Sequence, residues 1–200
     1  MTTGLATHPL ILDAGASFRG IARAAAGSSL AGRTPCEQWD LNALVRHLLF
    51  YAPVLAAAGR RSQPLPGPAA ESEITLDAAW ADQLAKGVDD VTDAWGDPAA
   101  WSGMTTMAGS DPMPAPMIGG MVLGELVVHG WDLAAATGVR PEFSADVLLG
   151  TDAAVEQMAE LGRGMGIFGP EIVVGADASF LDRIVARTGR NPGWPSAELD

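Results

Sequence analysis

Two histidines and a glutamate within apolar helical stretches are the residues of this chain best suited to chemistry. Glu125 and His129 stand four positions apart, a spacing that puts two side chains on one face of an α-helix. His47 lies far upstream in a second apolar helical stretch. If His47 faces that pair, three ligand atoms converge, as a divalent metal with open coordination positions requires. The sequence therefore predicts a metal site formed by His47, Glu125 and His129.

The position of Glu125 on a core-facing stripe strengthens this prediction. An unpaired buried carboxylate loses several kcal/mol of hydration, so something must compensate its charge. A cation held together with two neutral imidazoles would do so. Asp132 follows His129 by three residues and falls on the same stripe. We expect it to orient a ligand or a cosubstrate amine from outside the metal sphere, with a helix-to-loop hydrogen bond near Trp131 as the alternative.

Simpler explanations of these residues stay open at this point. A histidine on an apolar helix is often a hydrogen-bonded core residue, and a Glu-x-x-x-His pair can be a surface ion pair worth a few tenths of a kcal/mol. Cys36 is the single cysteine and has no partner for an internal disulfide. We expect it to be a small buried residue in a turn, with a chemical role as the alternative.

Charge and composition narrow the class of protein. The chain has 12 basic and 24 acidic residues, a net charge of −12, which would repel nucleic acids and anionic membranes. Hydrophobic residues make up 48% of the chain but aromatic ones only 6%, which favours packed helices in a single domain over residues 1–200. The sequence has no Gly-rich phosphate-binding motif. With no signal-peptide pattern and a lone cysteine, it predicts a cytoplasmic protein.

Apolar periodicity predicts mainly helices. Asp40 is expected to cap the second helix, Gly59 to end it, and Ser144 to cap the fifth. Prolines and glycines predict a long irregular connection over 96–116, which could cover the site. The expected helices span 10–26, 41–58, 75–95 (with one acidic, solvated face), 117–137 (ended by Gly138), 144–162 and 177–188 (ended by Gly189).

Three stretches resemble a known family in order and spacing: 34–47 (TPCEQWDLNALVRH), 123–138 (LGELVVHGWDLAAATG) and 189–194 (GRNPGW). The chain resembles the DinB-like (YfiT-type) metalloenzymes, and within them an actinobacterial branch related to mycothiol-dependent maleylpyruvate isomerase. A single lysine beside abundant alanine, glycine and arginine is similar to the coding bias of that branch. The resemblance extends over nearly the whole chain.

This resemblance implies an all-α fold, a four-helix bundle with up-down-down-up topology and additional short C-terminal helices. It implies a divalent metal, zinc or nickel, held by His47 of the second helix and by Glu125 and His129 of the fourth. It also implies a low-molecular-weight thiol, mycothiol or similar, as cosubstrate. The isomerase carries a further C-terminal domain with no counterpart after Trp194. Its substrate and its catalytic arginine are therefore not carried over.

The expected function is that of a metal- and thiol-dependent enzyme. A bound thiolate would attack a small electrophile in S-transfer, conjugate addition or cis-trans isomerisation. A metal-dependent hydrolase, and a non-catalytic bundle or dimer stabilised by a metal, are the alternatives. The expected partners are a small-molecule substrate and a thiol, with a homodimer left open and with neither nucleic acid nor membrane.

Overall fold

The computed structural model describes residues 8–107 and 110–194, and nearly all of its regular structure is helical. This confirms the predicted all-α class. The up-down-down-up order of the bundle stays a prediction. The helices are α1 (His8–Ala24), α2 (Leu41–Arg60), α3 (Trp80–Trp95), α4 (Ala115–Gly124), α5 (Gly130–Thr137), α6 (Ala145–Gly164) and α7 (Phe180–Arg187), with the short turns η1 (Glu71–Glu73), η2 (Pro98–Trp101) and η3 (Glu125–His129) and the strands β1 (Met104–Thr105) and β2 (Met113–Pro114).

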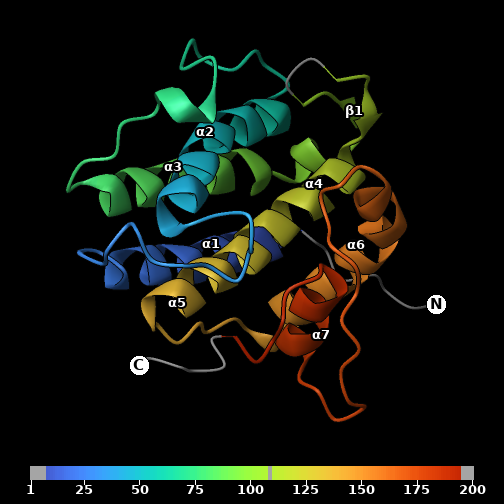
Figure 1. Cartoon of the computed structure of the whole chain (residues 1–200). Helices are drawn as coiled ribbons and strands as arrows, with labels where there is room; N and C mark the ends of the chain where they lie inside the picture. Colours follow the sequence, from blue (N-terminus) through green and yellow to red (C-terminus); the bar gives the residue numbers. More distant parts are fainter. Residues whose placement is uncertain (1–7, 108–109, 195–200) are drawn as a thin grey trace.

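The central packing joins α2 to α3, and α3 to α1 (Figure 1). The run α4, η3 and α5 crosses this group, while α6 packs on α4 and α7 packs on α6. Fully buried apolar side chains from α1, α2, α3 and α4 form one continuous core, in which Phe18, Leu44, Trp95 and Ile118 are large members. The indole of Trp95 also donates a 2.8 Å hydrogen bond to the Leu55 carbonyl, which ties α3 to α2.

The helix that carries His47 starts where the sequence predicts and ends later. Asp40 accepts a hydrogen bond from the Ala43 amide at 2.8 Å and caps α2. Gly59 does not end the helix, because the left-handed residue is Arg61, with φ of 53°. A Cβ on Gly59 would lie 2.9 Å from the Trp95 indole nitrogen, so this glycine allows close packing of α2 on α3.

Several other predicted boundaries move by a few residues. His8 begins α1 instead of lying in a tail, and α1 ends at Ala24. The third helix starts at Trp80, because the Asp77 carboxylate accepts from the Ala79 amide and forms a turn there. Gly138 ends α5 with φ of 71°, as predicted. Ser144 caps α6, as predicted, and Ser179 caps α7.

The predicted fourth helix contains an irregular turn at its most polar point. Residues 125–129 form η3, a π-helical turn, between the α-helical segments α4 and α5. In an α-helix four residues advance by roughly 400°, which leaves the two side chains about 40° apart. A π-turn holds more residues, so the angle between the Glu125 and His129 side chains differs from that in an α-helix. Across this turn Glu125 Oε2 and His129 Nε2 lie 3.4 Å apart.

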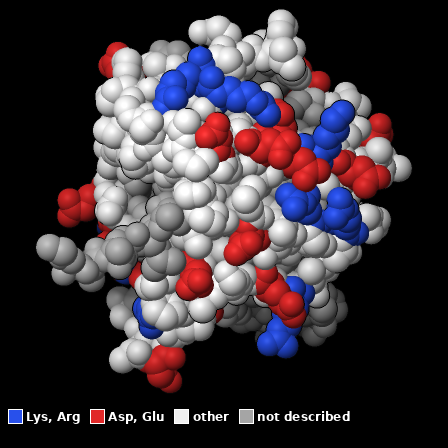
Figure 2. Space-filling view, turned by 180° about the vertical axis from the view of Figure 1, so that it is seen from behind, with Lys and Arg blue, Asp and Glu red and all other residues white. Residues whose placement is uncertain are grey.

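The outer face of α3 is acidic and exposed, as predicted. Asp89 pairs with Arg19 at 3.0 Å, and Asp90 pairs with Arg60 at 2.7 Å. On the side of the molecule opposite to that in Figure 1, basic side chains lie next to acidic ones (Figure 2). One described helix, α2, is long and apolar enough to cross a membrane by length and composition. A helix that packs in a protein core passes the same test.

Candidate metal centre

The structure brings His47, Glu125 and His129 together, although they belong to two distant segments of the chain. Each offers one ligand atom, and the three atoms lie within 4.8 Å of one another. The Glu125 Oε2 atom lies 3.4 Å from His129 Nε2 and 3.8 Å from His47 Nε2. Ligand atoms bound at 2.0–2.2 Å around a tetrahedral zinc lie roughly 3.4 Å apart. The spacing of the three side chains therefore fits a common cation.

Both imidazoles are oriented by carboxylates on their outer nitrogens. His47 Nδ1 lies 3.1 Å from Glu71 Oε1, and His129 Nδ1 lies 2.9 Å from Asp132 Oδ2. Because an ionised carboxylate only accepts hydrogen bonds, each neutral imidazole carries its proton on Nδ1. The lone pair of each Nε2 is then free on the side of Glu125. This arrangement is common behind metal-bound histidines, and it is the second feature that fits a cation.

Asp132 belongs to a buried ion pair. Its side chain is completely buried, and its carboxylate accepts hydrogen bonds from Arg190 Nε and Nη2, the latter at 3.0 Å. It lies behind His129 and does not line the cavity, so it orients a histidine and cannot reach a cosubstrate amine. Burial by itself would raise the pKa of Asp132. The hydrogen bond from His129 and the charge of Arg190 outweigh burial and hold that pKa below its usual value.

The charges within the cluster favour an ionised Glu125. Burial would raise the pKa of this carboxyl, but His129, His47 and Arg190 lower it. The pKa of His47 moves the other way: burial opposes its protonation, and the carboxylates of Glu125 and Glu71 outweigh burial and raise the pKa. In the absence of a cation, a proton on His47 therefore compensates part of the local negative charge.

Two aromatic rings enclose the histidines. The Trp39 ring lies 4.5 Å from the His47 ring and 5.7 Å from the His129 ring, measured between centroids. The Tyr51 ring lies 4.7 Å from His47 on the same helix. These rings restrict the rotamers of His47 and limit access of water to one side of the cluster.

A cavity of about 880 Å³ opens onto the three candidate ligands. Its walls also include Cys36, Trp39 and Glu71, together with residues of α4, α6 and the chain after α6. Cys36 is half-buried, and its burial raises the pKa of the thiol, which disfavours the nucleophilic thiolate. The expectation that 96–116 covers the site is wrong for the described part of that segment, none of which lines the cavity. Thr105 instead bonds to the Ala58 carbonyl at the other end of α2.

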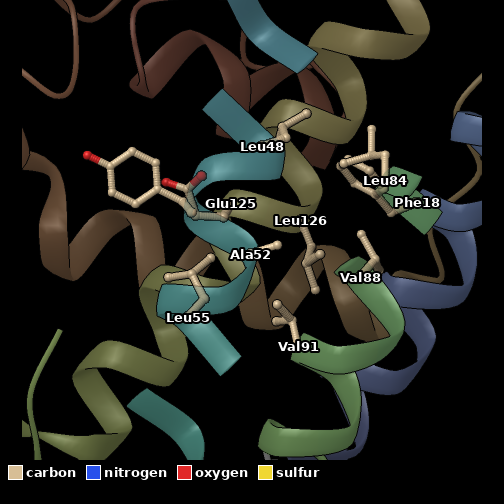
Figure 3. Close-up of a pocket in the computed structure, with 10 residues that line it drawn as sticks. Phe18, Leu48, Ala52, Leu55, Leu84, Val88, Val91, Glu125 and Leu126 are labelled. Atoms are coloured by element: carbon tan, nitrogen blue, oxygen red, sulfur yellow. The ribbon is translucent and has the colours of Figure 1, made fainter. Parts of the chain in front are cut away.

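A second, much smaller cavity lies behind the cluster. It measures about 30 Å³ and is enclosed almost wholly by apolar side chains of α1, α2, α3 and η3. Glu125 stands at one end of this void, while Phe18 and Leu84 stand at the other (Figure 3). An apolar space that holds about one water offers it too few hydrogen bonds to stay. The core side of Glu125 therefore provides no solvation, and its charge is stabilised on the other side, where the histidines and the large cavity lie.

Sequence reasoning missed Glu71 and Arg190 as parts of this cluster. Glu71 lies in a loop rich in proline, glycine and serine, where an acidic residue indicates only exposure. Arg190 follows α7 and is separated from Asp132 by 58 positions. It falls within 189–194, one of the stretches that carry the family resemblance, and that was the available signal. No helical spacing links either residue to a histidine.

The comparison with family models agrees with this architecture. The model of the mycothiol maleylpyruvate isomerase N-terminal domain matches residues 11–134, and the chain belongs to this family. It is thus a DinB-like domain of the group related to maleylpyruvate isomerase. The match covers α1 to α5 and includes all three candidate ligands, whereas α6, α7 and Arg190 lie outside it. No curated protein and no solved structure matches the chain.

Replacing Asp132 by asparagine should destabilise the fold by about 3 kcal/mol or more, because Arg190 keeps a buried charge that nothing neutralises. Urea unfolding at pH 7 measures the loss. Asp89→Asn is the matched control, since it removes an exposed pairing partner of Arg19 and should cost less than about 1 kcal/mol. Equal losses in the two variants would contradict a special role for the Asp132–Arg190 pair.

The stability lost in Asp132→Asn should also depend on pH. The pKa of Asp132 is lower in the folded chain than in the unfolded one, so its stabilisation is present above the ordinary carboxyl pKa and is lost as pH falls through the folded value. The stability difference between the wild type and Asp132→Asn should therefore shrink below about pH 4. A difference that stays constant down to pH 2 would show that the Asp132 charge does not produce it.

Proposed function

We propose that this chain is a divalent-metal-dependent enzyme that uses a low-molecular-weight thiol, mycothiol or a similar one, to act on a small electrophile. The reaction is S-transfer, conjugate addition or cis-trans isomerisation. His47, Glu125 and His129 would hold the metal, with zinc or nickel as the cations suited to this set of two imidazoles and a carboxylate. We expect a cytoplasmic protein, because mycothiol-type cosubstrates need a reducing compartment to stay as thiols.

One observation carries the proposal: two Nε2 atoms and one Oε2 atom converge at a cavity of about 880 Å³. Three protein ligands leave at least one coordination position open, which is typical of catalytic rather than structural zinc. The matched family is named after a mycothiol-dependent isomerase, which supports a thiol as the cosubstrate.

The residues around the cluster support this function in two ways: they orient the candidate ligands and they shield the site from water. A divalent cation in this place would lower the pKa of a coordinated thiol toward neutrality. Glu71 and Asp132 keep the Nε2 atoms of the two histidines directed at Glu125. Trp39 and Tyr51 cover one side of His47 and reduce the water around the thiol. Less water around a thiolate raises its reactivity toward carbon.

The three reactions begin with the same bond-forming step. The thiolate sulfur forms a C–S bond to the electrophilic carbon. In conjugate addition the thiol proton ends on the neighbouring carbon, and in S-transfer a leaving group departs with the electron pair of its bond. In isomerisation the C–S bond breaks again after rotation about the former double bond, and the thiol is regenerated. None of these reactions needs an oxidant or a reductant.

Metal content tests the site directly. Protein purified without added metal should contain close to one equivalent of zinc or nickel by elemental analysis. His47→Ala and His129→Ala should each lower the metal affinity by more than about 100-fold, since loss of a partner that merely orients a ligand already costs 10–100-fold. His8→Ala is the matched control, because His8 begins α1 away from the cavity. Equal metal content in all three variants would overturn the proposed site.

Glu71 provides a finer test of the same site. Glu71→Ala should weaken zinc binding by about 10–100-fold, because His47 loses the acceptor on Nδ1 that fixes its ring. Glu71→Gln keeps a carbonyl oxygen as acceptor and should restore much of the affinity. Competition with a chromogenic chelator measures both. Glu73→Ala is the control from the same turn, and its affinity should equal that of the wild type.

Thiol dependence separates the proposed enzyme from a hydrolase. The metal-loaded protein should accelerate the reaction of mycothiol with a neutral electrophile such as 1-chloro-2,4-dinitrobenzene, with the S-conjugate detected by mass spectrometry. The rate should saturate with thiol concentration and fall at least tenfold in the metal-depleted protein. Turnover of ester or amide substrates in buffer without thiol, together with no S-conjugate, would instead identify the open position as a site for hydrolysis.

A further inference from the structure

Part of the lining of the large cavity consists of residues without polar side chains, and we call this part the apolar arm. It is bounded by Gly120 and Gly124 on α4, Ala154 and Met158 on α6, and residues 166–170 after α6. Every lining residue of this arm is glycine, alanine, methionine, isoleucine, phenylalanine or proline. The α6 wall runs from Ala154 to Gly162, or about 12 Å at 1.5 Å per residue.

One glycine of α4 leaves the arm open beside the candidate metal ligands, and another allows α4 to pack closely on α6. Gly124 directly precedes Glu125, and a Cβ there would meet only Val155 at an ordinary 3.8 Å. A Cβ on Gly120 would come to 3.2 Å from the Cβ of Ala154, so α4 and α6 approach each other closely at this point. The arm is thus a continuation of the cavity that faces Glu125, bordered by closely packed helices.

The charged groups of the whole cavity do not form a site for an acidic substrate. Its lining includes the carboxylates of Glu37, Glu71 and Glu125 but only one guanidinium, that of Arg190. Arg190 donates from Nε and Nη2 to Asp132 and from Nη1 to the Thr188 carbonyl. Three of its five N–H groups are therefore committed to the protein, and its charge is neutralised by a buried carboxylate.

We propose that the electrophile of this enzyme is a neutral molecule whose apolar chain or ring occupies the apolar arm. This inference rests on the proposed metal- and thiol-dependent function and specifies its substrate class. Apolar groups gain free energy when they leave water for a lining of this kind. A carboxylate in the arm would lose its hydration and find no counter-charge among the lining residues. A dicarboxylate such as maleylpyruvate is therefore a poor match for this cavity, although the matched family is named for that substrate.

Hydroxamic acids test this proposal, because they share one metal-binding head and differ only in the chain behind it. Acetohydroxamate, butanohydroxamate, hexanohydroxamate and octanohydroxamate are titrated into the zinc-loaded protein. Binding is followed by isothermal titration calorimetry. Affinity should rise by roughly fourfold for each methylene that enters the arm. The ω-carboxylate of the eight-carbon compound should bind at least tenfold more weakly than octanohydroxamate. Equal affinity along the series, or equal affinity of the ω-carboxylate, would overturn the proposal.

A pair of variants on α6 tests whether the alkyl chain of the hydroxamate occupies the apolar arm. Ala154→Leu adds a side chain at the wall, where α6 lies close to Gly120 of α4, so its urea unfolding is measured alongside. The folded variant should bind octanohydroxamate at least tenfold more weakly and acetohydroxamate as the wild type does. Ala153→Leu is the matched control, because Ala153 is exposed on the same helix and does not line the cavity. Unchanged octanohydroxamate binding in Ala154→Leu would show that the alkyl chain of the ligand lies outside the apolar arm, and it would refute the proposed substrate class.

This experiment distinguishes failure of the proposed function from failure of the proposed substrate class. If the proposed function is wrong because no metal is held, acetohydroxamate itself fails to bind and zinc addition changes nothing. If only the substrate class is wrong, acetohydroxamate binds in a zinc-dependent way, and chain length or the terminal carboxylate makes no difference.

Discussion

The carboxylate of Glu125 imposes the constraint on which the rest of the site depends. It projects from a helix whose neighbouring residues Leu126, Val127 and Val128 are buried apolar side chains, and the small void behind it is too apolar to hold water. Its charge is therefore stabilised on the other side, which the two histidines share with the large cavity. The two histidines therefore help to stabilise the Glu125 charge, which an ordinary hydrogen-bonded core histidine does not do. The Nδ1 atoms of the two histidines are held by Glu71 and Asp132, so the imidazole rings are not free to rotate.

The backbone meets this requirement with a single irregular turn. Glu125 and His129 stand at the two ends of the π-turn η3, and their Oε2 and Nε2 atoms lie 3.4 Å apart. The turn sits inside an otherwise continuous run from Ala115 to Thr137, so the helices on either side hold it in place. Asp132, in the first turn of α5, then reaches back to His129, and Arg190 anchors Asp132 from the far end of the chain. The positions of α4, α5 and the segment after α7 are thus linked through one imidazole.

The sequence was sufficient for the features that depend on local spacing. Glu125, His129 and Asp132 were found because a helix converts intervals of three and four residues into one face, and His47 because it is a histidine within a second apolar helical stretch. The caps at Asp40 and Gly138 were found because side-chain oxygens and glycine have fixed uses at helix ends. The prediction that Gly59 ends the second helix was wrong because glycine also occurs where two helices pack closely. Glu71 and Arg190 were missed since their contacts span 24 and 58 positions, and only the tertiary fold sets those distances.

The charges of the cluster explain why a divalent cation, bound at the proposed site, would compete with a proton. Asp132 and Arg190 neutralise each other, which leaves the carboxylates of Glu71 and Glu125 opposite two imidazoles. Two negative charges call for two positive ones, and a cation such as zinc supplies both at once while the imidazoles stay neutral. Without it the balance must come from protons, which is the direction in which the pKa of His47 is moved. With the cation in place the centre is close to neutral, so it offers no net attraction to an anion beyond the metal itself. Selection among substrates then falls to the uncharged walls of the cavity, where shape and apolar contact decide.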